Sequence, residues 1–172
     1  MPRLPEITVP NNDNQEAFDY LVKTRGAVRG GFAVTLVSPD ITQRMAHVGT
    51  YVRFDSPVEK LFREVAATVA SAELNNPAEY VVHARQLRQM GVNESVVQAI
   101  LDLAPVIGAS ADESIAINLA RELTRDHKLS DATFQAAQQR LGDAGVVDLI
   151  AAVGYYAMLA VCHVALDIPA PK

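Results

Sequence analysis

The sequence has no tryptophan and a single cysteine, Cys162, and aromatic residues make up only 6% of its 172 positions. One cysteine cannot form a disulfide within the chain. Because Cys162 lies in an apolar run, a small buried hydrophobe is favoured over a reactive thiol. Alanine and valine are abundant, and hydrophobic residues reach 49%. This composition excludes a disordered chain, suits tightly packed helices and gives one domain enough material for a core.

Basic residues are also scarce, with 15 Lys and Arg against 20 Asp and Glu, a net charge of −5 and a pI near 5.3. No basic stripe is available to neutralise phosphates, so we expect no nucleic-acid partner. The start of the chain lacks the apolar core of a signal peptide, which predicts a cytoplasmic location.

Long hydrophobic runs are missing as well. The longest covers residues 149–162 and is interrupted only by Gly154. It falls short of the roughly 20 residues that a membrane-spanning helix needs. We therefore expect a buried core or interface helix there and no membrane partner.

The sequence is rich in residues that begin and end helices. Three prolines and two asparagines in residues 1–12 predict an extended leader over 1–14, followed by one domain over 15–172. Three pairs have capping-box spacing: Ser56 with Glu59, Asn76 with Glu79, and Ser110 with Glu113. The helices that we expect cover residues 15–25, 39–50, 57–74, 77–90, 94–103, 111–127, 131–141 and 144–166.

The segment 32–37 is rich in β-branched residues but has no evident pairing partner, so a loop or a short helical turn is expected. No segment alternates convincingly with a period of two. The predicted fold class is all-α.

One cluster of residues has side chains suited to acid–base catalysis. If 77–90 is helical, Glu79 and His83 share one face, which pairs a carboxylate with the side chain that titrates near neutral pH. A short connection at Asn75 and Asn76 would fold the preceding helix back, so that Glu64 meets His83. The alternative is that Glu79 only caps its helix at Asn76 and that His83 is a buried, hydrogen-bonded histidine. The sequence leaves both open.

A histidine with two glutamates can bind iron or zinc. No second ligand histidine stands at helical spacing in this region, because His47, His127 and His163 are scattered along the chain. We therefore expect no metal.

The stretch Ala78-Glu79-Tyr80-Val81-Val82-His83, followed by Gly91-Val92-Asn93 and preceded by Glu64, resembles the motif of the carboxymuconolactone decarboxylase family. That family belongs to the alkylhydroperoxidase D-like superfamily. Similar stretches cover nearly the whole chain after residue 15: Ser38-Pro39-Asp40, Tyr51-Val52-Arg53-Phe54, Ala120-Arg121-Glu122-Leu123, Ser130-Asp131-Ala132-Thr133-Phe134, Gly145-Val146-Val147-Asp148-Leu149, Val153-Gly154-Tyr155-Tyr156 and Asp167-Ile168-Pro169.

The resemblance implies an all-α alkylhydroperoxidase D-like bundle that assembles into homo-oligomers, often trimers or hexamers. Its peroxidase branch carries Cys-x-x-Cys ahead of the histidine, and those positions are Asn76 and Glu79 here. Dithiol peroxide reduction is therefore not possible at this site. The residues fit the decarboxylase branch better, which works by proton transfer without metal or organic cofactor.

The chain also departs from its relatives. Tyr80 stands where many have tryptophan, and His163-Val164-Ala165 stands where many longer members have Leu-Asn-Ala. These departures leave the substrate open.

The resulting hypothesis is a cofactor-free lyase acting on a small carboxylic acid or lactone. His83 is the predicted general acid/base, Glu79 orients it or shares the proton, and Glu64 tunes it. Arg53 is the candidate cation for a substrate carboxylate, although a surface salt bridge is the alternative. The remaining candidate substrate-binding residues are Asn76, Tyr80 and Tyr155. Alternative functions are a peroxidase-type oxidoreductase and an inactive oligomeric binding protein.

Overall fold

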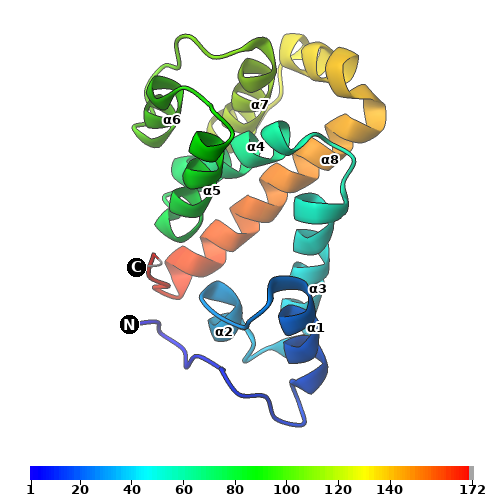
Figure 1. Ribbon diagram of the computed structural model, residues 1–172, viewed down its shortest axis with the longest axis vertical. Coiled ribbons are helices and arrows are strands. Elements are labelled where there is room, and N and C mark those ends of the chain that lie inside the picture. Colours follow the sequence, from blue (N-terminus) through cyan, green and yellow to red (C-terminus); the bar gives the residue numbers. More distant parts are fainter. Residues whose placement is uncertain (171–172) are drawn as a thin grey trace.

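The computed structural model describes residues 1–170, and regular structure in this range is helical throughout, which confirms the all-α prediction (Figure 1). The α-helices are α1 (Gln15–Arg25), α2 (Gly31–Thr35), α3 (Pro39–Thr50), α4 (Lys60–Glu73), α5 (Pro77–Gln89), α6 (Glu94–Leu101), α7 (Ala111–Arg121) and α8 (Asp131–Ala165). Two π-helical turns, η1 (Tyr51–Asp55) and η2 (Glu122–Asp126), continue α3 and α7.

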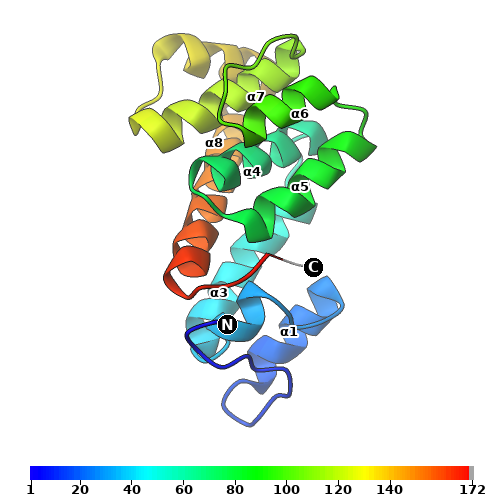
Figure 2. The ribbon, with the colours of Figure 1, turned by 90° about the vertical axis from the view of Figure 1, so that its left-hand side faces the viewer.

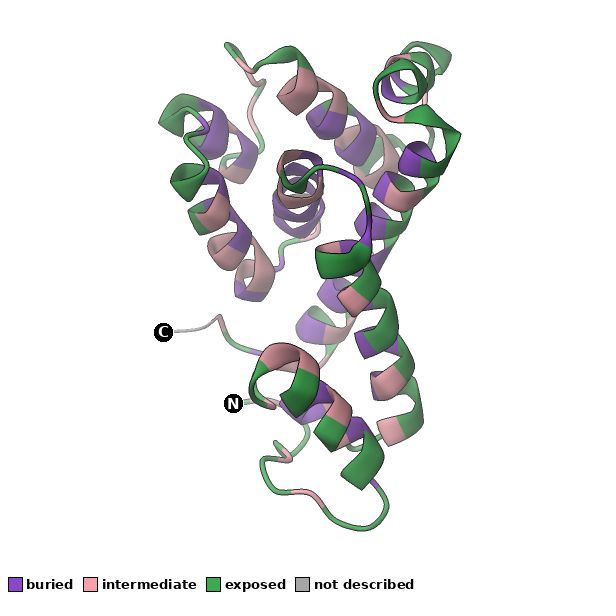
Figure 3. Ribbon diagram, turned by 45° about the vertical axis from the view of Figure 1, so that its right-hand side comes forward, coloured by how far each residue is buried: buried purple, intermediate pink, exposed green. Residues whose placement is uncertain are grey.

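The helices form two groups joined by α8. In Figures 1 and 2, α1–α3 lie together at one end, α4–α7 lie at the other, and α8 runs between them. The central α4 packs against α5, α7 and α8, and its side chains from Val65 to Ala72 are all buried. A smaller core of Ala17, Leu21, Leu36 and Ala46 holds the first group. Buried residues line the inward faces of the helices (Figure 3).

Most helix ends lie where the sequence predicts them, but two of the three predicted capping boxes, at Ser56 and at Asn76, do not form. Ser110 and Glu113 form the predicted capping box. The expected box at Ser56 is wrong, because α4 begins at Lys60 and its N-cap is Glu59. The Ser56 hydroxyl donates instead to Asp148 Oδ2 on α8, at 2.6 Å. The same hydroxyl accepts from the Val58 N–H at 3.2 Å, so Ser56 bonds both a local and a tertiary partner without capping α4.

The long α8 bends at Gly142, whose backbone is left-handed (φ 70°), close to the break expected between residues 141 and 144. By length and composition alone, α8 is apolar enough to cross a membrane, with a mean hydropathy of 1.9 in its most apolar window. Half of that window is buried inside the fold, as in the core helices of soluble proteins.

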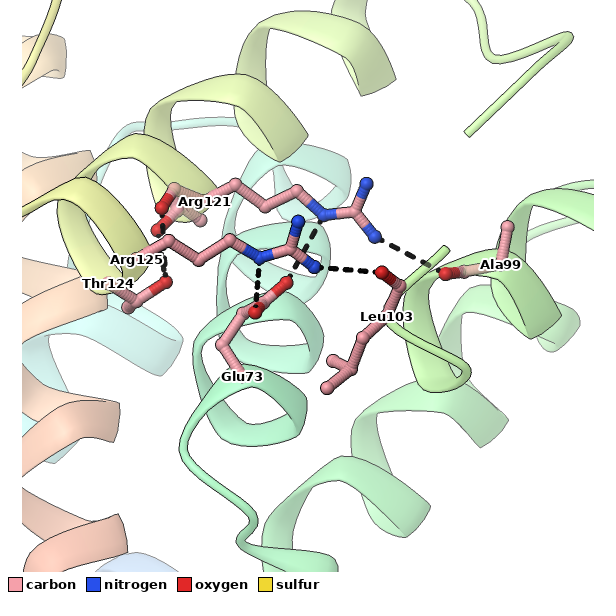
Figure 4. Close-up of polar contacts among 7 residues, drawn as sticks. Glu73, Ala99, Leu103, Arg121, Thr124 and Arg125 are labelled. Carbon is pink, nitrogen blue, oxygen red and sulfur yellow. Dashed lines mark hydrogen bonds and ion pairs between the residues drawn. The ribbon is translucent and has the colours of Figure 1, made fainter. Parts of the chain in front are cut away.

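A buried ion cluster ties the second group of helices together (Figure 4). The Glu73 carboxylate, at the end of α4, pairs with Arg121 at 3.2 Å and with Arg125 at 2.5 Å. The same two guanidinium groups donate to the carbonyls of Ala99 and Leu103, at 3.2 and 3.0 Å. These contacts fix the end of α4 against α7, η2 and the region of α6.

Candidate active site

The α4–α5 hairpin brings Glu64 and His83 together. Asn75 adopts a left-handed conformation (φ 53°) at the corner, which is a conformation that asparagine tolerates well. His83, only 1% exposed, donates from Nδ1 to Glu64 Oε2 at 2.6 Å. The donor is the ring because an ionised carboxylate can only accept.

Glu79 approaches the opposite nitrogen of the same ring, with its Oε2 3.5 Å from His83 Nε2. Glu79 does not cap its helix, because the Asn76 N–H, from which it would accept in a capping box, already donates to the Ser71 carbonyl at 2.7 Å. The Asn76 side chain makes no cap hydrogen bond either. Glu79 is therefore available to the imidazole, and the helix begins without a capping box.

The three groups shift one another's pKa values. Burial alone would lower the pKa of His83, but the hydrogen bond to Glu64 and the negative charges of Glu64 and Glu79 outweigh it and raise that pKa above 6.5. Burial would likewise raise the pKa of both carboxyls, and the contact with His83 lowers each below 4.5. The arrangement favours an imidazolium between two carboxylates.

His83 Nε2 is the nitrogen that remains free to exchange a proton. It is buried and has no hydrogen-bond partner among the described residues, since its contact with Glu79 is too long. The Tyr156 ring packs edge-on against the imidazole, with centroids 4.7 Å apart. Glu64 on one side and Tyr156 on the other thus hold the orientation of the ring.

Two hollows flank the cluster. The first, of about 420 Å³, is lined by Arg53, Phe54, Lys60, Arg63, Glu64, Val82, His83 and Gln86. The second, of about 320 Å³, is lined by Thr24, Arg25, Ala27, Arg29, Phe32, Arg53, Phe54 and Glu79. Arg53 and Phe54 border both. The two carboxylate partners of His83 therefore face different hollows.

The predicted substrate-binding residues have different surroundings. Arg53 lines both hollows, as the prediction for a cation near the site requires. Asn76 is buried, accepts from His163 Nδ1 at 3.0 Å and lines a separate hollow of about 230 Å³. Tyr80 packs against the main core. Tyr155 is buried against Tyr156 and Gly49, and burial raises its pKa to about 12.

Sequence reasoning missed most of the positive charge around the site. Lys60 and Arg63 lie within a turn of Glu64, and helical spacing from Glu64 could have found them. Arg25 and Arg29 reach the site from another helix group through long-range packing, which no local pattern encodes. The sequence analysis selected Tyr155, but Tyr156 is the tyrosine that packs against His83, and the sequence does not tell which of the two does so.

Glu64 and Glu79 bind opposite nitrogens of one ring, so they do not converge on a single point beside it. Within residues 1–170, no group of three or more His, Cys, Asp or Glu side chains is arranged to hold a metal ion. The arrangement can hold a proton on the His83 ring, which lines the first hollow.

Residues 39–122 match the family model described as the carboxymuconolactone decarboxylase family. This segment belongs to the carboxymuconolactone decarboxylase family. It contains Arg53, Glu64, Glu79 and His83, whereas α1, α2 and α8 lie outside it. Among curated proteins, none matches the chain.

Solved structures share the fold over almost the full chain. An uncharacterised peroxidase-related protein from Ralstonia eutropha JMP134, described as an alkylhydroperoxidase AhpD core, is 16% identical, with 99% of this chain and 93% of that chain covered and a TM-score of 0.73. A peroxidase-related protein from Silicibacter sp. TM1040 is 15% identical, with 99% and 92% covered and a TM-score of 0.74.

A third structure is the debrominase Bmp8, in a cysteine-to-alanine variant bound to 2,3,4-tribromopyrrole. It is 12% identical, with 100% of this chain and 95% of that chain covered and a TM-score of 0.74. Identities this low establish the fold alone. The protein therefore has the alkylhydroperoxidase D-like fold, a scaffold that includes enzymes, around a decarboxylase-family segment.

Proposed function

We propose that the protein is a cofactor-free lyase of the decarboxylase type, acting on a small carboxylic acid or lactone. The observation that carries this proposal is His83, held by Glu64 at 2.6 Å through Nδ1 and lining a hollow with its Nε2 unbonded. A buried imidazole with one nitrogen anchored and the other free is suited to general acid–base catalysis.

The reaction needs one proton. In a β-keto acid or a conjugated lactone, the bond to the leaving carboxylate breaks and its electron pair moves into the neighbouring carbonyl as an enolate. Carbon dioxide leaves, and the enolate carbon takes the proton from His83 Nε2. The ring is then neutral and regains a proton from water. Glu64 keeps Nδ1 protonated, so Nε2 is the nitrogen that cycles.

The positive side chains around the first hollow support an acidic substrate. Arg53, Lys60 and Arg63 line it together with only one carboxylate, Glu64. A guanidinium or ammonium group can hold a substrate carboxylate and stabilise the charge that develops on the enolate oxygen. The hollow thus combines a cationic wall with a proton donor.

Thiol chemistry fits these residues poorly. Cys162 is the single cysteine of the chain, lies on α8, and has a pKa that burial raises. Dithiol peroxide reduction requires two cysteines and a reactive thiolate. We further propose that the protein is cytoplasmic and works as a homo-oligomer with a small-molecule substrate.

The test is release of carbon dioxide, or loss of substrate, with carboxylated lactones, β-keto acids and muconate-type acids. His83→Asn keeps an amide donor near Glu64 and removes Nε2. We expect turnover to fall by about 10²- to 10⁴-fold. His127→Asn, at an exposed position, is the matched control and should retain full activity. Equal turnover in the two variants would show that His83 is not the proton donor and would favour a different function.

A further inference from the structure

The second hollow is built largely by residues that precede the family segment. Thr24, Arg25, Ala27, Arg29 and Phe32 line it, and the matched segment begins at residue 39. The remaining lining residues are Arg53, Phe54 and Glu79. The α1–α2 region therefore adds a wall of its own beside the Glu79 side of the His83 cluster.

This wall is positively charged. Three guanidinium groups, of Arg25, Arg29 and Arg53, share the hollow with one carboxylate, Glu79. Glu79 is itself engaged with His83. The whole chain carries a net charge of −5, so the cations are concentrated here against the overall balance. A cleft lined by one sign of charge attracts ligands of the opposite sign.

Three of the five N–H donors of Arg25 are bonded within the fold, which holds the guanidinium group in place. Its Nη1 donates to Thr24 and Thr50, and its Nη2 donates to the Ala46 carbonyl at 2.9 Å. The guanidinium group also lies 4.6 Å from the centre of the Phe32 ring. Its Nε is buried and has no hydrogen-bond partner within the described residues. Buried donors are normally paired, so the unpaired Nε is an exception within the fold, while the residue as a whole lines the hollow.

Arg29 lies on the turn between α1 and α2. Gly26 and Gly30 frame this turn, and both adopt positive φ angles, of 79° and 57°. Within residues 1–170, no hydrogen bond or ion pair engages the Arg29 side chain. Its guanidinium group is thus available, beside the fixed guanidinium of Arg25, for a planar anion that accepts two hydrogen bonds.

We propose that Arg25 and Arg29 form a binding subsite for a carboxylate of the substrate, on the far side of Arg53 and Phe54 from Lys60 and Arg63. The anchoring carboxylate is then separate from the group that reacts beside His83. This assignment of the reacting end rests on the proposed function, whereas anion binding at Arg25 and Arg29 does not.

The subsite selects molecules by length as well as by charge. A ligand that contacts both the Arg25–Arg29 pair and His83 has to extend across both hollows, which share Arg53 and Phe54 as lining residues. Arg53 borders both hollows and can contact the middle of such a molecule. The N-terminal helices thereby act as a specificity element added to the family segment.

The experiment is an NMR titration of the full-length protein with hexanoate and, separately, with the uncharged hexanamide. We expect hexanoate to shift the amide resonances of Ala27 and Phe32, and hexanamide to leave them in place. Arg29→Gln should weaken hexanoate binding by about tenfold or more, which is the scale of one charge-assisted contact. Lys23→Gln removes the same charge from an exposed position on α1 outside the hollow, and should bind as the unmodified protein does.

Two outcomes would overturn the proposal: equal hexanoate affinity in the Arg29 and Lys23 variants, or equal binding of hexanamide and hexanoate. The titration is independent of turnover and so separates the two proposals. Hexanoate binding that survives His83→Asn but not Arg29→Gln supports the subsite even if His83 proves dispensable for chemistry. Turnover lost in His83→Asn with hexanoate binding unchanged in Arg29→Gln would refute the subsite alone.

Discussion

His83 owes its character to carboxylates on both ring nitrogens. Glu64 alone would fix the tautomer and leave Nε2 as an acceptor. Glu79 adds a second negative charge at 3.5 Å, close enough to favour the protonated ring and too far to engage its proton fully. At this distance Glu79 does not hold the Nε2 proton in a hydrogen bond. A substrate atom can therefore replace Glu79 as the acceptor of that proton, which a closed salt bridge would prevent.

The stability of the protein should depend on pH through these three groups. The pKa of His83 is raised above 6.5, so its stabilising contribution is complete below pH 6.5 and is lost as the pH rises through the raised pKa. The pKa values of Glu64 and Glu79 are lowered below 4.5, so their contribution is complete above pH 4.5 and is lost as the pH falls through them.

We therefore expect the free energy of unfolding in urea to be highest between about pH 4.5 and 6.5 and to fall on both sides. His83→Asn should flatten the alkaline decline. A decline above pH 7 of the same size in that variant would show that other groups cause it.

The residue-level pairing of Glu64 with His83 was predictable, because a short connection after α4 fixes how its helix folds back. The choice of Glu79 between cap and imidazole was not. It depends on the Asn76 N–H reaching the Ser71 carbonyl, which is set by the left-handed corner at Asn75. The presence of Arg25 and Arg29 at the site could not be predicted either, since only tertiary packing brings them there.

At the scale of the helices, most helix starts lie where the sequence predicts them, but only one of the three predicted capping boxes forms. Ser110 caps α7 as its spacing indicates, whereas Ser56 bonds the Val58 N–H and Asp148 on α8 and caps no helix. The π-helical turn η1 has no sequence signature that we recognise, yet it carries Arg53. Such turns are often found at functional sites.

The close approach of α3 to α8 depends on Gly49. A Cβ atom there would lie 2.2 Å from Tyr155 Oη and 3.0 Å from Arg25 Nη2. We expect Gly49→Ala to lower the free energy of unfolding by about 1–3 kcal/mol, because a packed contact must shift. Val48→Ala, at an exposed position one residue away, serves as the control in the same urea titration. Equal midpoints for the two variants would contradict the close packing.

The Glu73 cluster should contribute strongly to the joining of α4 to α7 and η2 (Figure 4). The Glu73 side chain is 5% exposed and balances two arginines. Glu73→Gln leaves both cations partly buried without a counter-charge, and we expect a loss of about 3 kcal/mol in chemical denaturation. Glu94→Gln breaks the exposed pair with Arg88 and should leave the midpoint nearly unchanged. Similar small losses in both variants would mean that solvent screens the Glu73 cluster as well.

At the scale of the whole molecule, the solvent-exposed face of α8 is apolar. Val147, Val161 and Val164 are 64%, 67% and 54% exposed, and Gly154 lies open between them. A helix that is apolar on all sides is normally covered. We predict a solution mass of three or six times the 18.6 kDa chain by light scattering, and a lower mass for Val161→Glu. A monomer at micromolar concentration would refute the predicted assembly.

The all-α architecture was predictable from composition and helix punctuation. The arrangement of the two helix groups about α8 was not. Solved structures at 12–16% identity share the fold, so the arrangement tolerates extensive change of sequence. The cationic lining of the second hollow depends on that arrangement, because Arg25 and Arg29 meet Arg53 of η1 only in the folded protein.

The most direct test of the central claim is an NMR titration of the imidazole nitrogens of His83. The pKa should lie above 6.5, with both nitrogens protonated at lower pH, and Glu64→Gln should lower it. His163, whose pKa burial lowers, provides a comparison in the same spectra. A His83 pKa below 6.5, or one unaffected by Glu64→Gln, would contradict a charged imidazole poised between two carboxylates.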